Sequence, residues 1–177
     1  MPIARTLFTE NKKLRIFDFD DTLVKTNSFI YITHKDGKKS KLSPGEYAVY
    51  KERPGDQYDF SDFQKVTEPK LIKGYVEVLR RMASADSGRT IYILTARAAY
   101  RPVYDFIRSV GIRNIEVVAL GDNNPEKKAD WIETKVKDEG YDDVFFVDDS
   151  LKNVEAVRKR LKGYPEVKQK IQHIKHS

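Results

Sequence analysis

Residues 15–24 read RIFDFDDTLV: an apolar run ends in three carboxylates within four residues, Asp18, Asp20 and Asp21. A short, almost continuous apolar run is typical of a β-strand that is buried on both faces. Carboxylates this close together repel one another and raise one another's pKa values. The sequence therefore predicts a buried strand that delivers concentrated negative charge to one place.

Three further apolar runs alternate with amphipathic helical patterns along the chain. With residues 14–19, these runs predict four strands, the others lying at residues 91–94, 115–120 and 144–147. The helices between and after them are expected to begin at Pro69, Pro102, Asn124 and Ser150, since Pro is common in a first helical turn and Ser and Asn are common caps. This alternation predicts an α/β fold: a Rossmann-like open parallel sheet with helices on both faces.

Two segments break the alternation. Residues 25–66 form an insert after the first strand, and within it residues 27–42 predict a β-hairpin flap with a type I′ turn at Asp36-Gly37. A short helix is expected at residues 46–51. Residues 165–176 carry apolar side chains at helical spacing and predict a basic C-terminal helix. We expect residues 1–177 to form a single domain.

The composition narrows the function classes. The 177 residues are 40% hydrophobic and include no cysteine, which excludes disulfides and thiolate chemistry and fits a reducing, cytoplasmic location. No apolar run approaches the roughly 20 residues of a membrane span, so no membrane partner is expected.

The net charge of +6 is concentrated in residues 151–177, with a smaller lysine cluster in residues 35–41. Such basic surfaces attract polyanions, and they also occur as ordinary solvated helix faces. The oligomeric state is not indicated.

Polar residues follow the predicted strands at their carboxyl ends. Thr95 and Arg97 follow the second strand, Asp148 and Asp149 follow the fourth, and a lysine pair, residues 127–128, opens the helix before it. A parallel sheet gathers these ends at one edge, where ligands bind in such folds. Four or more carboxylates at one edge require a hard cation, and oxygen ligands suit Mg²⁺.

Four motifs in series resemble those of the haloacid dehalogenase-like (HAD) superfamily over residues 13–162. In order, they are FDFDDTLV, IYILTAR, a lysine on a helix, and FFVDDS. The resemblance implies that Asp18 is the nucleophile that forms an aspartyl phosphate. It implies that Asp20 protonates the leaving oxygen and then takes a proton from water. Dehalogenases of this superfamily lack an Asp at that position, so Asp20 favours phosphoryl transfer.

The resemblance also implies how Mg²⁺ is held. Its ligands would be Asp18, the main-chain carbonyl of Asp20, and the pair Asp148 and Asp149. The pattern of the family favours Asp149 as the direct ligand and Asp148 as its neighbour, and the choice stays open.

The phosphate is expected to contact Thr95, Arg97 and a lysine. Lys128 is favoured over Lys127 because it shares the buried face of its helix with Trp131 and Ile132. Thr95 alone would also fit a strand-end residue that satisfies backbone groups.

The substrate is expected to be a phosphoester. The insert is too short for a large folded cap, so the chain resembles capless or minimally capped members, which often act on large substrates. Thr95-x-Arg97 and the Asp-Asp motif are similar to the phosphatase domains of polynucleotide kinase-phosphatases, although no kinase P-loop occurs. We therefore expect a Mg²⁺-dependent phosphomonoesterase acting on polynucleotide or nucleotide phosphate ends. The alternatives are a small-metabolite or phosphoprotein phosphatase, and a non-catalytic phosphate-binding or receiver-like module.

Overall fold

The computed structural model describes residues 11–84 and 88–175. Its centre is a sheet of five parallel strands in the order β10-β9-β1-β7-β8. The strands are β1 (Lys13–Phe17), β7 (Arg89–Thr95), β8 (Glu116–Ala119), β9 (Asp143–Asp148) and β10 (Lys168–His173). The predicted Rossmann-like open parallel sheet is confirmed, with one strand more than the sequence indicated.

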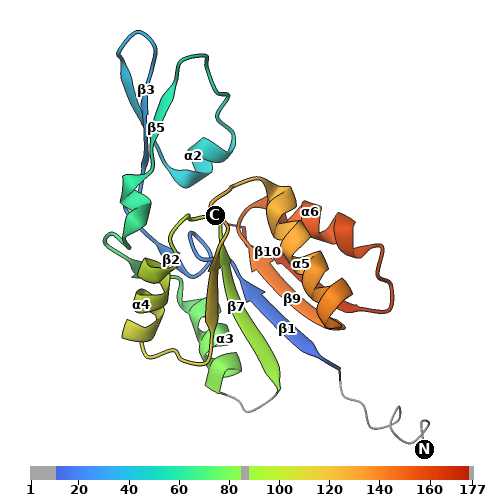
Figure 1. The fold of residues 1–177 in the computed structure, drawn as a ribbon. Coiled ribbons are helices and arrows are strands. Elements are labelled where there is room, and N and C mark those ends of the chain that lie inside the picture. Colours follow the sequence, from blue (N-terminus) through green and yellow to red (C-terminus); the bar gives the residue numbers. More distant parts are fainter. Residues whose placement is uncertain (1–10, 85–87, 176–177) are drawn as a thin grey trace, which may run out of the picture.

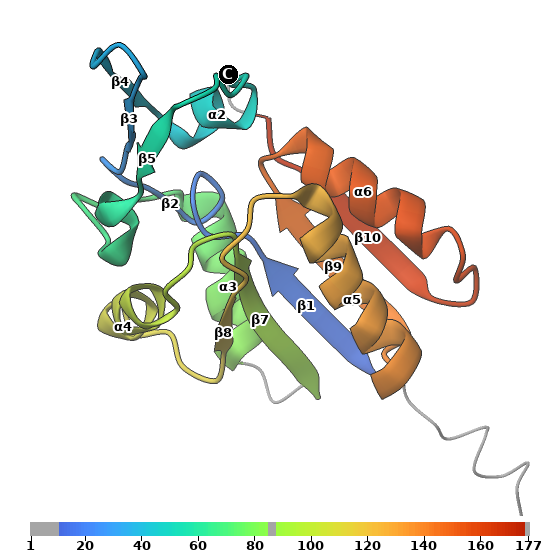
Figure 2. The same ribbon diagram turned by 45° about the horizontal axis from the view of Figure 1, so that its top comes forward.

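Four helices cover the two faces of this sheet (Figure 1). They are α3 (Lys73–Ser84), α4 (Arg101–Ser109), α5 (Pro125–Glu139) and α6 (Leu151–Leu161). Helices α5 and α6 pack on one face, while α3 and α4 lie on the other, as the turned view also shows (Figure 2). None of the described helices is long and apolar enough to cross a membrane.

One apolar cluster lies on each face of the sheet, because side chains alternate between its faces along each strand. In β1, Ile16 faces α5 and α6, whereas Phe17 faces α3 and α4; both are fully buried. In β9, Phe146 and Val147 divide in the same way. The central strands are therefore buried on both sides, which fixes their register and the position of their carboxyl ends.

The insert stands above the carboxyl edge of the sheet (Figures 1 and 2). Its entry and exit pair as the short antiparallel strands β2 (Val24–Lys25) and β6 (Lys70–Leu71), so we define the insert as residues 26–69. It contains a three-stranded sheet in the order β4-β3-β5. The elements are β3 (Ile30–Thr33), β4 (Lys39–Leu42), α2 (Pro44–Ala48), β5 (Gln57–Asp59) and the 3₁₀ helix η1 (Ser61–Gln64).

The hairpin flap is confirmed, but its predicted type I′ turn is wrong. The His34 nitrogen donates to the Lys38 oxygen at 2.8 Å, and the Gly37 nitrogen donates to the His34 oxygen at 2.9 Å. Gly37 has a φ of +85°, whereas Asp36 does not have a positive φ. A type I′ turn needs positive φ at both central residues, so the connection is instead a three-residue loop closed by a left-handed glycine.

The predicted helix at residues 165–176 is also wrong where the structure describes it; its last residue lies outside the described range. Residues 168–173 form strand β10, which pairs with β9 throughout its length. The apolar spacing of Val167, Ile171 and Ile174 fits a helix, but these residues reach both apolar clusters from an extended chain. Pairing the otherwise open edge of β9 outweighs the weak local helical signal.

The helix after Pro69 begins four residues later than the sequence suggested. Lys70 and Leu71 are used by β6, which closes the insert against β2. Leu71 is therefore exposed rather than part of the apolar stripe, and the buried residues of α3 are Val76, Leu79 and Ala83.

Candidate active site

Three carboxylates meet at the carboxyl edge of the sheet. Asp18 directly follows β1, Asp148 ends β9, and Asp149 comes next. Because Phe17 is in register with Val147, and the Asp18 nitrogen donates to the Val147 oxygen at 3.0 Å, the two strands bring these residues side by side. One carboxylate oxygen from each of the three lies within 4.8 Å of the others, a spacing that could hold a metal ion.

Lys128 lies between two of these carboxylates. Its Nζ donates to Asp18 Oδ1 at 2.7 Å and to Asp148 Oδ2 at 2.9 Å. Asn124 caps the start of α5, and Lys128 lies on the buried face of this helix with Ile132 and Val136. Lys128 is 2% exposed whereas Lys127 is exposed, so the structure brings Lys128 and not Lys127 to Asp18.

Asp18 and Asp148 also accept hydrogen bonds from uncharged groups. The Thr22 hydroxyl donates to Asp18 Oδ2 at 3.0 Å. Asp148 accepts from the Ser150 nitrogen at 2.9 Å and from the Asn153 side-chain amide at 3.0 Å. Ser150 also caps α6, so one turn both starts a helix and holds a carboxylate.

The electrostatics of the cluster favour a cation. Burial raises the pKa of Asp18 well above its usual value, and Asp148 raises it further against the opposing effect of Lys128. Burial also raises the pKa of Asp149 to about 7, while a hydrogen bond to Asp18 opposes the rise. Burial lowers the pKa of Lys128, but the charges of Asp148 and Asp18 outweigh it and the net shift is upward. One ammonium group does not neutralise three carboxylates. The carboxylate oxygens are ligands of the kind that Mg²⁺ prefers.

Asp20 faces a different partner. Arg97 Nε donates to Asp20 Oδ2 at 2.9 Å, and Arg97 Nη2 donates to Asp20 Oδ1 at 2.8 Å. This is a bidentate ion pair in which both carboxylate oxygens accept. The sequence placed Arg97 on the phosphate; that role stays a prediction, and the structure instead brings Arg97 to Asp20.

Thr95 ends β7 and is 1% exposed. Its hydroxyl oxygen accepts from the Arg97 nitrogen at 3.1 Å. The structure thus shows the backbone-satisfying role that the sequence left open for Thr95. Its contact with phosphate stays a prediction.

Three neighbours of the site were not in the predicted set. Thr22 belongs to the first motif, and its spacing of four residues from Asp18 could have placed it. Asn153 stands where an acid is common in the resembled superfamily, and its contact with Asp148 supplies the hydrogen-bonding role. Asp21 stands where that superfamily often has glycine. The φ of Asp21 is +62°, a left-handed backbone conformation that glycine adopts more readily than other residues.

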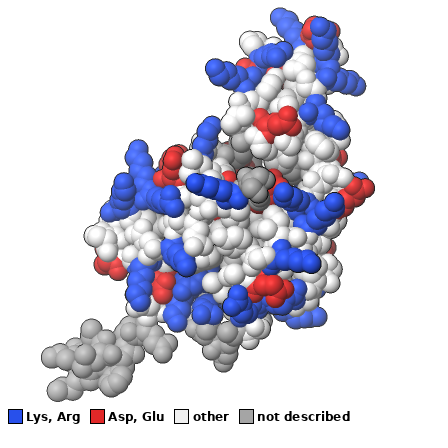
Figure 3. All heavy atoms as spheres, turned by 180° about the vertical axis from the view of Figure 1, so that it is seen from behind, with Lys and Arg blue, Asp and Glu red and all other residues white. Residues whose placement is uncertain are grey.

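The insert places basic and aromatic side chains above this edge. Lys35, Lys38, Lys39 and Lys41 are all exposed, and Figure 3 shows Lys and Arg at the outer end of the small sheet. An aromatic cluster lies beside it: Tyr47, Tyr58 and Phe60 have ring centroids 5.6–6.1 Å apart, and Phe60 is 44% exposed.

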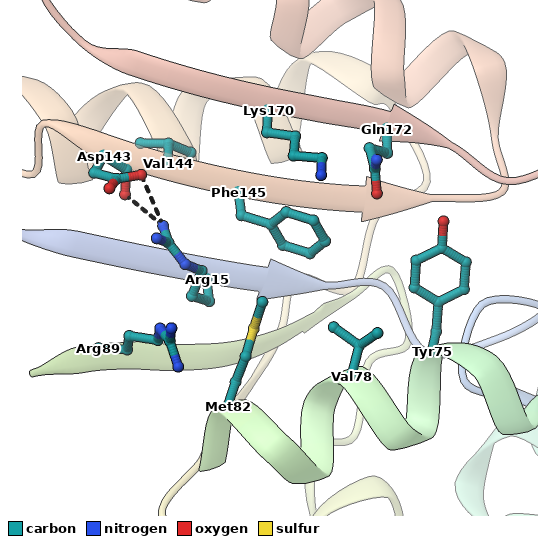
Figure 4. Close-up of a pocket in the computed structure, with 10 residues that line it drawn as sticks. All are labelled: Arg15, Tyr75, Val78, Met82, Arg89, Asp143, Val144, Phe145, Lys170 and Gln172. Carbon is teal, nitrogen blue, oxygen red and sulfur yellow. Dashed lines mark hydrogen bonds and ion pairs between the residues drawn. The ribbon is translucent and has the colours of Figure 1, made fainter. Parts of the chain in front are cut away.

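A cavity of about 320 Å³ lies elsewhere, between α3 and strands β1, β9 and β10 (Figure 4). Met82 and Phe145 contribute apolar walls, and Arg15 pairs with Asp143 inside it. None of the strand-end residues above lines this cavity, so it is separate from the candidate site.

Comparison with known proteins identifies one fold relative. No known family model matches the chain, and no curated protein matches it. A solved structure, a chain of the "Pnkp1/Rnl/Hen1 RNA repair complex", has a similar fold with a TM-score of 0.52 and 20% sequence identity. The match covers 93% of this chain and 43% of that one, so this chain spans less than half the length of its structural relative.

Proposed function

We propose that this chain is a Mg²⁺-dependent phosphomonoesterase of the HAD type, with Asp18 as nucleophile, acting on the phosphate ends of polynucleotides. The observation that carries the proposal is the convergence of Asp18, Lys128, Asp148 and Asp149 at one sheet edge. This set combines a candidate nucleophile, a fixed positive charge and a set of oxygen ligands.

The chemistry assigned to the chain's own residues is a double displacement. An Asp18 oxygen attacks phosphorus, the bond from phosphorus to the leaving oxygen breaks, and Asp20 gives that oxygen a proton. Water then attacks the aspartyl phosphate, Asp20 takes back a proton, and phosphate leaves with Asp18 regenerated. Lys128 holds Asp18 in place and stabilises charge on the transferring group, with Thr95 as a further donor.

A cation would be held by Asp18, Asp149 and the main-chain carbonyl of Asp20. Asp148 would support them, because its oxygens already accept from Ser150, Asn153 and Lys128. When bound, Mg²⁺ supplies positive charge that screens the nucleophile from the phosphate's own charge.

Two observations support a polynucleotide substrate. The exposed lysines and Phe60 offer phosphate contacts and a stacking surface on the insert, which stands above the edge where the proposed nucleophile lies (Figure 1). The relative of similar fold belongs to an RNA repair complex. This support is an analogy from the fold alone.

The test is Mg²⁺-dependent phosphate release from p-nitrophenyl phosphate, nucleoside monophosphates, and 5′- and 3′-phosphorylated oligonucleotides. We expect oligonucleotides to be preferred, with rates that fall steeply with salt. Asp18→Asn should lower every rate by about 10⁴-fold or more, because the nucleophile is lost.

Two results would change the conclusion. Preference for one small phosphoester with little salt dependence keeps the phosphatase and removes the polynucleotide substrate. No release from any substrate by the wild type removes the enzyme and leaves a phosphate-binding module.

A further inference from the structure

Arg97 is a buried cation whose contacts extend beyond the reacting groups. Its side chain is 2% exposed, although it lies in a loop after β7. Besides its two bonds to Asp20, its Nη1 donates to the Phe63 carbonyl at 3.1 Å and to the Lys65 carbonyl at 2.9 Å. Four donor contacts of one guanidinium group are therefore made within the protein.

Two aromatic rings close to the guanidinium group restrict Arg97 further. The guanidinium carbon lies 5.3 Å from the centroid of Phe19 and 5.1 Å from that of Phe63. Phe19 belongs to the first motif, whereas Phe63 belongs to η1 in the insert. Aromatic faces attract a guanidinium group, so the plane of its donors is held as well as its position.

Three separate segments thus meet at one side chain. The loop after β1 brings Asp20, the loop after β7 brings Arg97, and the end of the insert brings the carbonyls of Phe63 and Lys65. A guanidinium group has five N–H donors in a rigid fork, and these four contacts leave little capacity for a phosphate.

We infer that Arg97 is a positioning residue: it fixes the carboxyl group of Asp20 and ties that position to the insert. This inference rests on the proposed function, in which Asp20 exchanges protons with the leaving group and water. Through these two carbonyls the insert would act on the reaction without contacting the reacting phosphate, because displacing the Phe63 and Lys65 carbonyls displaces the fork that holds Asp20.

A lysine cannot replace this arrangement. Its ammonium group is a single charged point on a flexible stem, so it can contact Asp20 or a carbonyl but not hold both in one plane. Arg97→Lys therefore keeps the charge and removes the geometry, which makes it the informative substitution.

The experiment compares kcat/KM for two substrates with different leaving groups. Phenyl phosphate has the more basic leaving group and needs protonation, whereas p-nitrophenyl phosphate needs much less. If Arg97 positions Asp20, Arg97→Lys lowers kcat/KM for phenyl phosphate by about 10²-fold, which is the lower end of the rate contribution of a general acid. The same substitution lowers kcat/KM for p-nitrophenyl phosphate far less. Arg113→Gln, at an exposed arginine, is the matched control and should leave both values unchanged.

A second pair of variants separates positioning from misfolding. On an Asp20→Asn background, Arg97→Lys should add no further difference between the two substrates, since both changes act on the same proton transfer. An equal fall for both substrates in Arg97→Lys, or a further difference on the Asp20→Asn background, would overturn the inference. Wild-type protein that hydrolyses neither aryl phosphate nor any phosphorylated oligonucleotide would instead refute the proposed function, and this inference with it.

Discussion

The sheet edge and the insert handle charge in opposite ways. At the sheet edge, Asp18, Lys128 and Asp148 are buried and each bonds to another charged group. In the insert, the lysines of residues 35–41 are exposed to solvent. Buried charges must be neutralised within the protein, whereas exposed charges remain available for a ligand. Under the proposed function, the edge would carry out the chemistry that every substrate shares, and the insert would choose among substrates.

The largest effect should follow from removing the central cation of the edge. Lys128→Met leaves Asp18 and Asp148 buried, close together and without their shared partner, which should cost about 3–5 kcal/mol of unfolding free energy without metal. Urea unfolding in EDTA measures this loss, and phosphate release should fall in the same variant.

The neighbouring lysine is the matched control. Lys127 is exposed on the same turn, so Lys127→Met should change the unfolding free energy by about 0.5 kcal/mol or less. Equal effects of the two substitutions would mean that the buried ion pairs do not distinguish the edge from the surface.

The same contrast explains what the sequence could predict. The strands of the body were found because their apolar runs are nearly continuous, and parallel strands bring their carboxyl ends together wherever the helices lie. That rule placed Asp18, Asp148 and Asp149 at one edge, and helical periodicity selected Lys128. These inferences needed only local pattern and sheet topology.

Features that depend on distant partners were missed. Strand β10 looked helical because only its pairing with β9 makes it extended. Strand β5 lies in a loop-like sequence and exists because β3 offers it an edge. The contacts of Arg97 with the carbonyls of Phe63 and Lys65 were not predicted, because no sequence pattern brings these residues of the insert to Arg97.

A smaller effect concerns pH and Mg²⁺. The folded protein raises the pKa of Asp149 to about 7, from 3.8 for an ordinary Asp, and raises that of Asp18 as well. The folded state therefore binds these protons more tightly than the unfolded state, so their contribution to stability is complete below about pH 4 and is lost as pH rises through about 7. In EDTA, the melting temperature should fall from pH 5 to pH 8 by at least ~2 °C.

Mg²⁺ should offset this loss, because it binds the ionised carboxylates and competes with protons. The rise in melting temperature on adding Mg²⁺ should therefore be larger at pH 8 than at pH 5. Asp149→Asn should flatten the pH dependence in EDTA. The lowered pKa values of Asp56 and Asp59 in the insert act below pH 5 and do not enter this range. A melting temperature that rises from pH 5 to pH 8 would contradict the assignment.

The smallest effect, and the one that tests the insert alone, comes from its surface lysines. Lys38→Gln with Lys39→Gln removes two charges from exposed positions on the hairpin. Folding and p-nitrophenyl phosphate hydrolysis should not change, because neither side chain contacts the sheet edge. Oligonucleotide kcat/KM should fall several-fold at low salt. The slope of its logarithm against log[salt] should become shallower by about 0.7 for each phosphate group that the variant no longer neutralises.

A matched pair of lysines lies at the opposite edge of the sheet. Lys137, near the end of α5, and Lys162, after α6, are also exposed, so Lys137→Gln with Lys162→Gln changes the net charge equally without touching the insert. If both pairs change the oligonucleotide rate alike, only the overall positive charge attracts the substrate. If only the hairpin pair does so, the contact is local, and the insert selects polynucleotides for an edge that would otherwise accept any phosphoester.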